Sequence, residues 1–562
     1  MDDTRTGADL VVDAFEREGV EIVFGYPGGA IMPLHDALFQ HCVRHVLVRH
    51  EAAAAFAASA YARSTGRTGV CIATSGPGAT NLVTGIADAM LDNVPMVAIT
   101  GQVRSTLMGT DAFQEVDITG ITQVVTKRNV VVREARDIPR ALADAFRIAA
   151  GTRPGPVLVD IPSDVLKERV ALAEIPDAPR TIAPRPRASV VQIEAAVTAI
   201  RERARPVIIA GGGVRWAGAA AEFRAFCART GIPHASTLHG LGSADPRDDS
   251  FLGMLGMHGW THANRAIARA DLILALGMRF DDRVTGNPKT FAPNARTIVH
   301  ADIDAAEFNK IVPAGITLHG DLKESLNALK QRLAGESLPS FTAWRDEIAT
   351  FGGALPVDAA EDGHLPATDV LDALLRAIPS NAIVTTDVGQ HQMWTAQRVR
   401  PHDPYSFLTS GGLGSMGFGF PAAIGAQFAH PNRPVFAIVG DGGFQMSMAE
   451  LATLRRYSVP VKIVLIDNRN LGMVRQWQQL FYGGRYASTS LWDNPDFCEI
   501  AAAYGVQAIH VDADTSLDDA VDAFVQCPSA ALLHATCYPQ ENCFPMIPSG
   551  TSVDHVVESA FA

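Results

Sequence analysis

The sequence lacks several features that mark membrane, extracellular and nucleic-acid-binding proteins. No apolar run is long enough to cross a bilayer, and no low-complexity tract interrupts the chain. The seven cysteines include no Cys-x-x-Cys pair, which fits a reduced compartment without a disulfide framework. The net charge of -13 argues against nucleic acid as a partner. Because the first residues show no signal-peptide core, we expect a cytoplasmic protein with no membrane partner.

The chain has ample apolar material for several cores. Hydrophobic residues make up 47% and charged residues 19% of the 562 positions, as in ordinary globular proteins. This length predicts about three or four domains. Apolar, β-branched runs alternate with helix-forming segments, a pattern typical of α/β domains with parallel sheets. Strands are predicted at 20–24, 45–49, 70–74, 96–100, 206–210, 270–276, 297–303, 383–387, 434–439 and 461–466.

One stretch joins two of these strands through a glycine-rich turn. Residues 434–439 and 461–466 are the apolar runs and the Gly-Asp-Gly sequence at 440–442 is the turn. Residues 444–454 carry good helix formers, with Glu450 on the polar face. The order strand, turn, helix, strand predicts a βαβ unit of a parallel sheet.

Two oxygen-bearing side chains end the strands of this unit. Asp441 follows the first strand and Asn468 the second, so both lie at the sheet edge where ligands bind. Their oxygens suit Mg²⁺ better than zinc, and Gly440 and Gly442 let a diphosphate approach the backbone. The alternative is an ordinary strand-turn-helix in which Asp441 caps the helix.

Glu51 is the acid of interest in the first part of the chain. It follows a predicted strand and begins an alanine-rich helix that runs to Arg63. Burial among apolar neighbours would raise the pKa of its carboxyl group, which suits acid-base chemistry. The alternative is a first-turn glutamate that stabilises the helix N-terminus. Farther on, three glycines at 211–213 follow a strand, which is weak evidence for a dinucleotide site and fits a helix-packing turn equally well.

Taken together, the motifs resemble one family. Gly-Asp-Gly followed by Asn468 resembles the thiamine diphosphate (ThDP) motif, and Glu51 with its helix resembles the catalytic glutamate segment of ThDP enzymes. Further matches are the segments 26–32, 75–81, 109–115, 153–157, 160–162, 253–259, 277–286, 302–304, 388–391, 410–416, 471–477 and 541–546. Nearly end to end, the chain is similar to the catalytic subunit of acetohydroxyacid synthase (acetolactate synthase).

The resemblance implies an α/β fold of three doubly wound parallel-sheet domains of the ThDP-dependent decarboxylase and carboligase type. The implied domains are a pyrimidine-binding ThDP domain (1–165), a linker (166–189), a central FAD-binding domain (190–335), a second linker (336–365), a diphosphate- and Mg²⁺-binding domain (366–540) and a C-terminal tail (541–562).

The resemblance also implies site residues. Glu51 and Gln114 would be catalytic, and Mg²⁺ would bind Asp441, Asn468 and the Asn470 backbone carbonyl. ThDP would be held by Tyr26, Pro27, Gly28, Gly389, Gln390, His391, Gly414, Met416, Gly440, Asp441, Gly442, Gly443, Asn468 and Met473. A structural FAD would contact Gly211, Gly212, Gly213, His258, Arg279 and Asp302. The substrate pocket would comprise Gly29, Phe113, Met257, Arg283, Val474 and Trp477.

The implied reaction decarboxylates pyruvate with ThDP and transfers the two-carbon hydroxyethyl unit to a second 2-keto acid. Pyruvate as acceptor gives 2-acetolactate and 2-ketobutyrate gives 2-aceto-2-hydroxybutyrate, in branched-chain amino acid biosynthesis. The resemblance implies a homodimer or tetramer with active sites between subunits, and a small regulatory subunit as a plausible partner. Alternatives are a related ThDP carboligase or decarboxylase, a pyruvate oxidase-type flavoenzyme and a non-catalytic binding paralogue.

Four positions depart from the usual family pattern. Asp467 replaces an Asn before the metal ligand Asn468, and Ala52 replaces a Gln after the catalytic glutamate. Ser163 replaces a Lys, and Arg104 replaces a Pro at a position associated with herbicide sensitivity. These changes bear on the acceptor and on inhibitor response.

Overall fold

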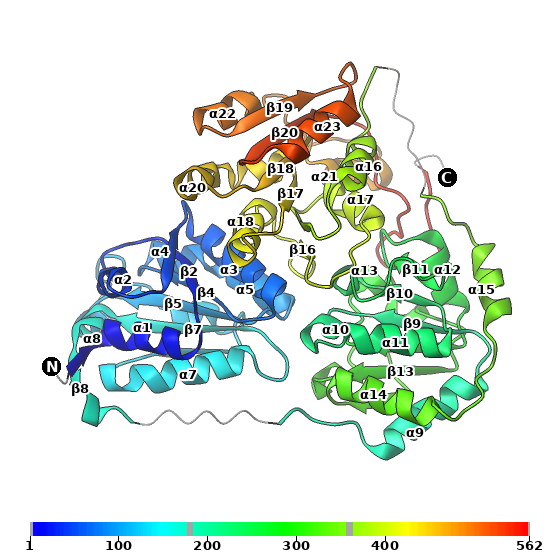
Figure 1. Cartoon of the computed structure of the whole chain (residues 1–562), viewed down its shortest axis with the longest axis horizontal. Coiled ribbons are helices and arrows are strands. Elements are labelled where there is room, and N and C mark those ends of the chain that lie inside the picture. Colours follow the sequence, from blue (N-terminus) through cyan, green and yellow to red (C-terminus); the bar gives the residue numbers. More distant parts are fainter. Residues whose placement is uncertain (1–3, 177–183, 356–362, 560–562) are drawn as a thin grey trace.

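The computed structural model describes residues 4–176, 184–355 and 363–559. Within them the chain forms three six-stranded sheets and one short two-stranded sheet. Figure 1 shows the first body (blue to cyan) beside the second (green), with the third (yellow to red) above them. The expected fold class, three doubly wound parallel-sheet domains, is confirmed.

The predicted domain bounds stay predictions. Parts of both predicted linkers, 177–183 and 356–362, lie outside the described residues, as do residues 1–3 and 560–562 at the chain ends.

The N-terminal sheet is wholly parallel, and its four inner strands are buried, as their near-continuous apolar sequences require. In spatial order the strands are β3 (Arg44–Leu47), β2 (Ile22–Gly25), β4 (Gly69–Ala73), β5 (Met96–Gln102), β7 (Pro156–Pro162) and β6 (Arg128–Val131). The helices are α1 (Gly7–Arg17), α2 (Met32–Phe39), α3 (Glu51–Thr65), α4 (Pro77–Asn81), α5 (Val83–Leu91), α6 (Ile118–Thr122), α7 (Ile138–Ala149) and α8 (Ser163–Lys167). Strands β1 (Thr4–Thr6) and β8 (Arg169–Ala171) form the antiparallel pair.

The middle sheet is also parallel throughout. Its spatial order is β11 (Phe251–Met254), β10 (His234–Ser236), β9 (Pro206–Ala210), β12 (Leu272–Leu276), β13 (Thr297–Asp302) and β14 (Ile316–His319). The accompanying helices are α9 (Val190–Glu202), α10 (Gly213–Trp216), α11 (Ala220–Thr230), α12 (Thr261–Arg269), α13 (Asp282–Thr285), α14 (Leu322–Leu333) and α15 (Thr342–Ala349).

The C-terminal sheet repeats this plan. Its spatial order is β16 (Phe407–Thr409), β15 (Ile383–Thr386), β17 (Val435–Gly440), β18 (Lys462–Asp467), β20 (Ala531–Thr536) and β19 (Gln507–Val511). Its helices are α16 (Ala367–Ala377), α17 (Gln390–Arg398), α18 (Gly419–Ala429), α19 (Asp441–Gln445), α20 (Leu451–Tyr457), α21 (Gly472–Phe481), α22 (Phe497–Ala503) and α23 (Leu517–Gln526).

Each sheet has one point where the winding changes side. These points lie between β2 and β4, between β9 and β12, and between β15 and β17. Loops that leave neighbouring strands at such a point diverge and open a crevice beyond the strand ends. The fold therefore predicts three ligand crevices, one in each domain.

Helices α3 and α18 join the first domain to the third. They approach closely because Gly425 has no side chain: a Cβ there would lie 2.7 Å from the Ala57 Cα. The rings of Phe56 and Phe418 pack edge to face at 5.5 Å, within one hydrophobic core that spans both domains. The helix that begins at Glu51 is thus fixed against the C-terminal domain of the same chain.

The prediction of one continuous helix over 444–454 is wrong. Helix α19 already begins at Asp441 and ends at Gln445, and a 3-10 turn at Met448–Glu450 precedes α20. This break turns Glu450 inward, where its carboxylate accepts backbone hydrogen bonds from Arg49 (2.7 Å) and His50 (3.2 Å). Glu450 is buried as a result and does not lie on a solvated face as the helical pattern suggested.

Candidate active site

The crevice between β15 and β17 collects most residues predicted for the diphosphate and the metal. It is lined by the loops after β15, β17 and β18 and by the start of α21. The predicted residues on its wall are Gly389, Gln390, His391, Met416, Gly440, Asp441, Gly442, Gly443, Asn468, Asn470, Met473 and Val474. Gly414 is absent from this wall and lies on the loop before Met416, with φ +70°.

His391 forms part of the floor of this crevice. Its Nε2 atom is buried and has no hydrogen-bond partner among the described residues. Burial lowers the pKa of His391 to about 3, so the ring is neutral at pH 7. A Cβ on Gly389 or on Gly440 would lie 2.9 Å from its Cε1, which explains why both loops carry glycine. The unpaired nitrogen is available to a ligand in the crevice.

Asp441 is a buried acid that forms no ion pair with any described residue. Burial, followed by the charge of Asp467, raises the pKa of Asp441 to about 8. The side-chain NH₂ of Asn494 lies between the two acids and donates to Asp441 Oδ2 (2.8 Å) and Asp467 Oδ1 (3.0 Å). A bound cation would restore the ionised carboxylate, so the donor set fits a hard metal ion.

Asp467, one of the departures from the family pattern, has its own partner. His534 Nε2 lies 2.9 Å from Asp467 Oδ2, on the side away from Asn494. Although burial opposes it, this hydrogen bond and charge hold the pKa of Asp467 below its usual value. The additional acid is therefore matched by an imidazole close to the residues predicted to bind the metal.

Asn468 and Asn470 form a tight turn around Arg469, whose φ is +54°. The backbone N–H of Asn470 donates to Asn468 Oδ1 at 3.2 Å, and its side-chain NH₂ donates to the Asn468 carbonyl at 2.8 Å. Asn468 in turn donates to Gln390 Oε1 at 3.2 Å. The amide groups are thereby held in fixed orientations on the wall of the crevice.

Glu51 lies in the N-terminal domain at the first residue of α3. Its Oε2 accepts a hydrogen bond from the Asn81 side chain at 2.9 Å, and a Cβ on Gly78 would lie 3.3 Å from its Oε1. The helix is capped by His50, whose Nδ1 accepts from the backbone of Ala52 at 3.1 Å. The Glu51 carboxylate, 8% exposed, is held by Asn81 and is not the cap of its own helix.

The other residues predicted for the N-terminal half of the site lie on two loops near the ends of β2 and β4. The loop at Tyr26, Pro27, Gly28 and Gly29 follows β2, and Gly28 packs so tightly on Thr74 that a Cβ would lie 2.5 Å from its side chain.

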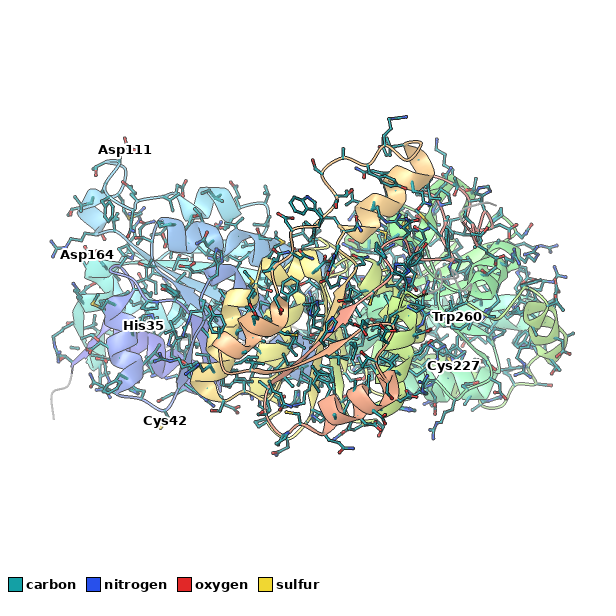
Figure 2. The ribbon with its side chains drawn as sticks, turned by 90° about the horizontal axis from the view of Figure 1, so that it is seen from above. His35, Cys42, Asp111, Asp164, Cys227 and Trp260 are labelled. Carbon is teal, nitrogen blue, oxygen red and sulfur yellow. The ribbon has the colours of Figure 1, made fainter. Side chains whose placement is uncertain are left out.

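Gln114 reaches the same area through its backbone. A Cβ on Gly76 would lie 2.7 Å from the Gln114 carbonyl, and Gln114 itself has φ +59°. Its neighbour Phe113 is 88% exposed. In Figure 2 this loop, marked by Asp111, stands at the outer edge of the N-terminal domain.

In the described part of the chain, the two halves of the predicted site do not line a common pocket. Every residue that lines the crevice between β15 and β17 comes from the C-terminal domain, between Val388 and Val474. Among the described residues, Glu51, Gln114 and the Tyr26 loop contribute nothing to that wall.

Three of the residues predicted for the substrate do come together. The Arg283 guanidinium lies 5.8 Å from the centre of the Trp477 ring, and its Nη1 lies 3.6 Å from the Met257 sulfur. Trp477 is on α21, whose first turn also lines the diphosphate crevice. The Arg283 guanidinium and the apolar side chains of Trp477 and Met257 therefore lie next to the predicted ThDP site.

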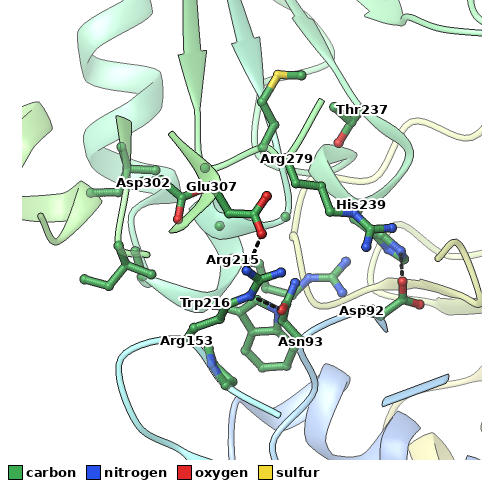
Figure 3. A pocket seen from close by; sticks show the side chains of 18 of the residues that line it. Asp92, Asn93, Arg153, Arg215, Trp216, Thr237, His239, Arg279, Asp302 and Glu307 are labelled. Carbon is green, nitrogen blue, oxygen red and sulfur yellow. Dashed lines mark hydrogen bonds and ion pairs between the residues drawn. The ribbon is translucent and has the colours of Figure 1, made fainter. Parts of the chain in front are cut away.

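A second pocket lies between the N-terminal and middle domains (Figure 3). It is open to solvent on one side and holds about 1050 Å³ of empty space, part of it open solvent, beyond the switch point between β9 and β12. Four residues predicted for FAD line it: Gly212, Gly213, Arg279 and Asp302.

Two residues predicted for FAD do not line this pocket. His258 is buried with its Nδ1 3.2 Å from the Pro545 carbonyl. A Cβ on Gly211 would lie 2.6 Å from the Met278 side chain, so Gly211 allows close packing of neighbouring loops.

Comparison with known proteins places this architecture in a family. Three family models match: the N-terminal TPP binding domain of thiamine pyrophosphate enzymes at residues 5–121, their central domain at 193–329 and their C-terminal TPP binding domain at 387–535. Thiamine pyrophosphate is the same compound as ThDP.

Full-length relatives narrow the family further. The acetolactate synthase isozyme 2 large subunit of Escherichia coli K12 is 47% identical over 552 residues, covering 98% of this chain and 99% of the relative. The chloroplastic acetolactate synthase of Arabidopsis thaliana is 45% identical over 573 residues, covering 99% and 85%. The acetolactate synthase large subunit of Corynebacterium glutamicum is 49% identical over 520 residues, covering 90% and 82%. The chain belongs to the acetolactate synthase large-subunit family.

Membership of the acetolactate synthase family agrees with the motifs in the sequence, but several residues around the sites escaped the motif analysis. Asn81 and Arg153 stand inside the matched segments and could have been noticed there. Asn494 and His534 carry no such signal, because their roles depend on contacts with Asp441 and Asp467 far away in the sequence.

Two of the departures from the acetolactate synthase pattern lie side by side. Arg104 precedes a turn whose next residue, Ser105, donates to Asp164 from its backbone (2.9 Å) and hydroxyl (3.2 Å). Ser163 is the neighbour of Asp164 and begins α8. Their effect on inhibitor response stays a prediction. Within the described residues, this member of the family has no helix that could serve as a membrane span.

Proposed function

We propose that this chain is the catalytic subunit of an acetohydroxyacid synthase. It decarboxylates pyruvate and joins the remaining two-carbon unit to a second 2-keto acid. The product is 2-acetolactate when the acceptor is pyruvate and 2-aceto-2-hydroxybutyrate when it is 2-ketobutyrate. The observation that carries this proposal is α21, which supplies both a wall of the diphosphate crevice and Trp477 beside Arg283.

The residues of the C-terminal crevice fit ThDP and Mg²⁺. His391 offers an unpaired buried nitrogen, the glycines at 389 and 440 leave room for a diphosphate, and Asp441 is an acid in need of a cation. We assign the metal to Asp441, Asn468 and the Asn470 carbonyl. When bound, ThDP supplies the electron sink for decarboxylation. Met416 supplies an apolar surface on the wall of the same crevice.

Glu51 is the acid-base group of the N-terminal half. Its carboxylate is buried and anchored on Oε2 by Asn81, which leaves Oε1 toward Gly78 to exchange a proton. Glu450 fixes the backbone just before it. Gln114 orients reacting groups from the neighbouring loop.

Arg283 recognises the carboxylate of the acceptor, because a guanidinium matches that group in charge and geometry. Trp477 and Met257 supply the apolar wall against which the acceptor's alkyl group packs. One additional methyl group in such a pocket is worth about 1–3 kcal/mol of discrimination, which suits a preference for 2-ketobutyrate. Phe113 would join this pocket from another subunit.

The separation of Glu51 from the Asp441 crevice requires more than one chain. We propose a homodimer, or a tetramer of such dimers, in which the N-terminal domain of one subunit completes the C-terminal site of another. A small regulatory subunit is a further proposed partner. We place the enzyme in the cytoplasm and in the biosynthesis of isoleucine, valine and leucine.

The pocket between the domains fits FAD. It lies beyond a topological switch point, carries Arg153, Arg215 and Arg279 for a diphosphate, and contains a buried Arg215 Nε without a partner among the described residues. Because the reaction involves no net oxidation, we propose that FAD is structural here.

Product analysis tests the proposed reaction. The purified protein, given ThDP, Mg²⁺ and FAD, should form acetolactate from pyruvate alone and mainly acetohydroxybutyrate when 2-ketobutyrate is added. Acetaldehyde as the product would indicate a related decarboxylase. Reduction of the flavin by pyruvate would indicate a pyruvate oxidase-type enzyme, and either result would refute the assignment.

A further inference from the structure

One buried carboxylate, Asp92, joins all three domains. It follows α5 in the N-terminal domain and bonds Arg63 Nη2 at 2.8 Å on the same domain. From the middle domain, His239 Nε2 approaches to 2.9 Å (Figure 3). From the C-terminal domain, it accepts the backbone N–H groups of Gly411 (3.1 Å) and Gly412 (2.7 Å). No motif in the sequence pointed to this residue.

Asp88, one helical turn earlier, completes the junction. It shares Arg63 Nη2 at 3.0 Å and accepts a hydrogen bond from the Ser410 hydroxyl. Burial and the neighbouring Asp92 outweigh Arg63 and raise the pKa of Asp88 to about 7. Although burial opposes it, His239, Arg63 and the Gly411 N–H hold the pKa of Asp92 well below its usual range. Asp92 is therefore the ionised member of the pair.

The loop that Asp92 holds is the loop that carries Met416. Ser410, Gly411 and Gly412 follow β16 and lead to Met416 on the wall of the ThDP crevice, and the Ser415 N–H donates to the Ser410 hydroxyl at 2.9 Å. The anchor and the wall are thus parts of one short, internally bonded segment.

This loop also packs closely against side chains that line the FAD pocket. A Cβ on Gly411 would lie 2.9 Å from Cε1 of His239. A Cβ on Gly412 would lie 2.7 Å from Asp92 Oδ1 and 3.0 Å from Arg279 Nη2. Asp92, His239 and Arg279 all line the FAD pocket. A shift of these side chains therefore requires a shift of the loop.

We propose that Asp92 is a positioning residue that couples the FAD pocket to the ThDP site. A flavin in the pocket holds His239 and Arg279 in place, Asp92 transmits this order to the loop at 410–416, and the ordered loop presents Met416 to ThDP. This inference rests on the proposed function, since it takes the two pockets to be the FAD and ThDP sites. It assigns to the structural flavin a thermodynamic role in binding the catalytic cofactor.

Coupling of this kind is reciprocal, so it can be measured from the flavin side. The holoenzyme is diluted into buffer with or without saturating ThDP and Mg²⁺, and the dissociation constant of FAD is obtained from the rise in flavin fluorescence. The ratio of the two constants is the coupling. We expect ThDP to tighten FAD binding by about tenfold in the wild-type protein.

Asp92→Asn tests the residue because it keeps the shape and removes the anion. The ratio should fall to within about twofold of unity. Glu307→Gln is the matched control. Glu307 lines the same pocket, but its carboxylate pairs with Arg153 (2.5 Å). This control should weaken FAD binding in both conditions and preserve the ratio.

A second variant covers the case in which Asp92→Asn fails to fold. His239→Gln leaves the Arg63 contact with Asp92 intact and should also lower the ratio. A ratio of unity in the wild-type protein, or an unchanged ratio in a folded Asp92→Asn or His239→Gln variant, would overturn the coupling alone. A wild-type protein that binds no FAD would overturn the coupling and the flavin assignment together.

Discussion

Two pairs of buried carboxylates in this molecule are neutralised in different ways. Asp88 and Asp92 face the guanidinium of Arg63, at 3.0 and 2.8 Å, so the chain itself provides their counter-charge. Arg63 is almost fully buried, and its remaining donors reach Ser59 (3.1 Å) and the Thr409 carbonyl (3.0 Å). This junction is complete without a ligand.

The second pair is incomplete. Asp441 and Asp467 contact each other and share the neutral amide of Asn494, and His534 pairs with Asp467 on the far side. Asp441 is left with a pKa near 8, raised by burial and by Asp467. A buried acid that is paired with a basic side chain of the same chain has a structural role. A buried acid that has no such partner is a candidate site for a bound cation.

The largest effect on stability is expected from removal of Arg63, the cation that neutralises Asp88 and Asp92. Arg63→Met should lower the free energy of unfolding by about 3–5 kcal/mol, because it leaves the buried Asp92 carboxylate without its guanidinium. Chemical denaturation followed by fluorescence measures this loss. Arg67→Met, in the largely exposed pair with Glu21 just beyond the same helix, should cost less than about 1 kcal/mol. Equal losses in the two variants would contradict this structural role.

Asp441→Asn should affect stabilisation by the ligands and not the folding of the metal-free protein. The metal-free protein should fold as well as wild type, since the carboxyl group is held protonated there and Asn is close in shape. The stabilisation by ThDP and Mg²⁺, about 2.7 kcal/mol at a hundredfold excess over the dissociation constant, should disappear. Thermal unfolding with and without the ligands measures both quantities. Retained stabilisation by Mg²⁺ and ThDP would show that Asp441 is not a metal ligand.

The titration of Asp88 gives a smaller, pH-dependent effect. Its folded-state pKa of about 7 lies above that of an unfolded carboxyl group, so its protonated form stabilises the fold. That stability is fully present below about pH 4 and is lost as the pH rises through 7, on the order of 2 kcal/mol. Asp88→Asn should flatten this part of the stability profile. A variant whose pH slope matches that of wild type would place the titration elsewhere.

The sequence predicted ten of the eighteen strands in the three large sheets and the edge at which the Asp441 crevice lies, for a physical reason. Parallel strands such as β17 and β18 are continuous apolar runs, and the loops after them carry glycine and oxygen donors at fixed positions. Where a strand ends is therefore readable locally. The Gly-Asp-Gly turn and Asn468 lie on the wall of one crevice, as expected.

Contacts between distant segments could not be predicted from the sequence. Glu450 appeared to be on a solvated helix face, yet it bonds Arg49 and His50, and nothing local records that contact. Asp92 and Asn494 likewise gain their roles from partners in other segments. The expected FAD contact His258 instead faces the Pro545 carbonyl, which only the packed structure places there.

The smallest expected effect concerns the preference for the acceptor, and it follows from a comparison of two arginines. Arg63 is fully occupied by the chain, whereas the Arg283 side chain is 54% exposed and lies beside the Trp477 ring, open to a carboxylate. Trp477→Leu should keep catalysis and lower the preference for 2-ketobutyrate over pyruvate by about 1–2 kcal/mol, or roughly tenfold. Product ratios from mixed substrates measure it. Trp492→Leu removes a highly exposed indole and should leave the ratio unchanged. An unaltered ratio in Trp477→Leu would mean that another residue selects the acceptor, and that the apolar wall beside Arg283 is only part of the core around Met257 and Phe544.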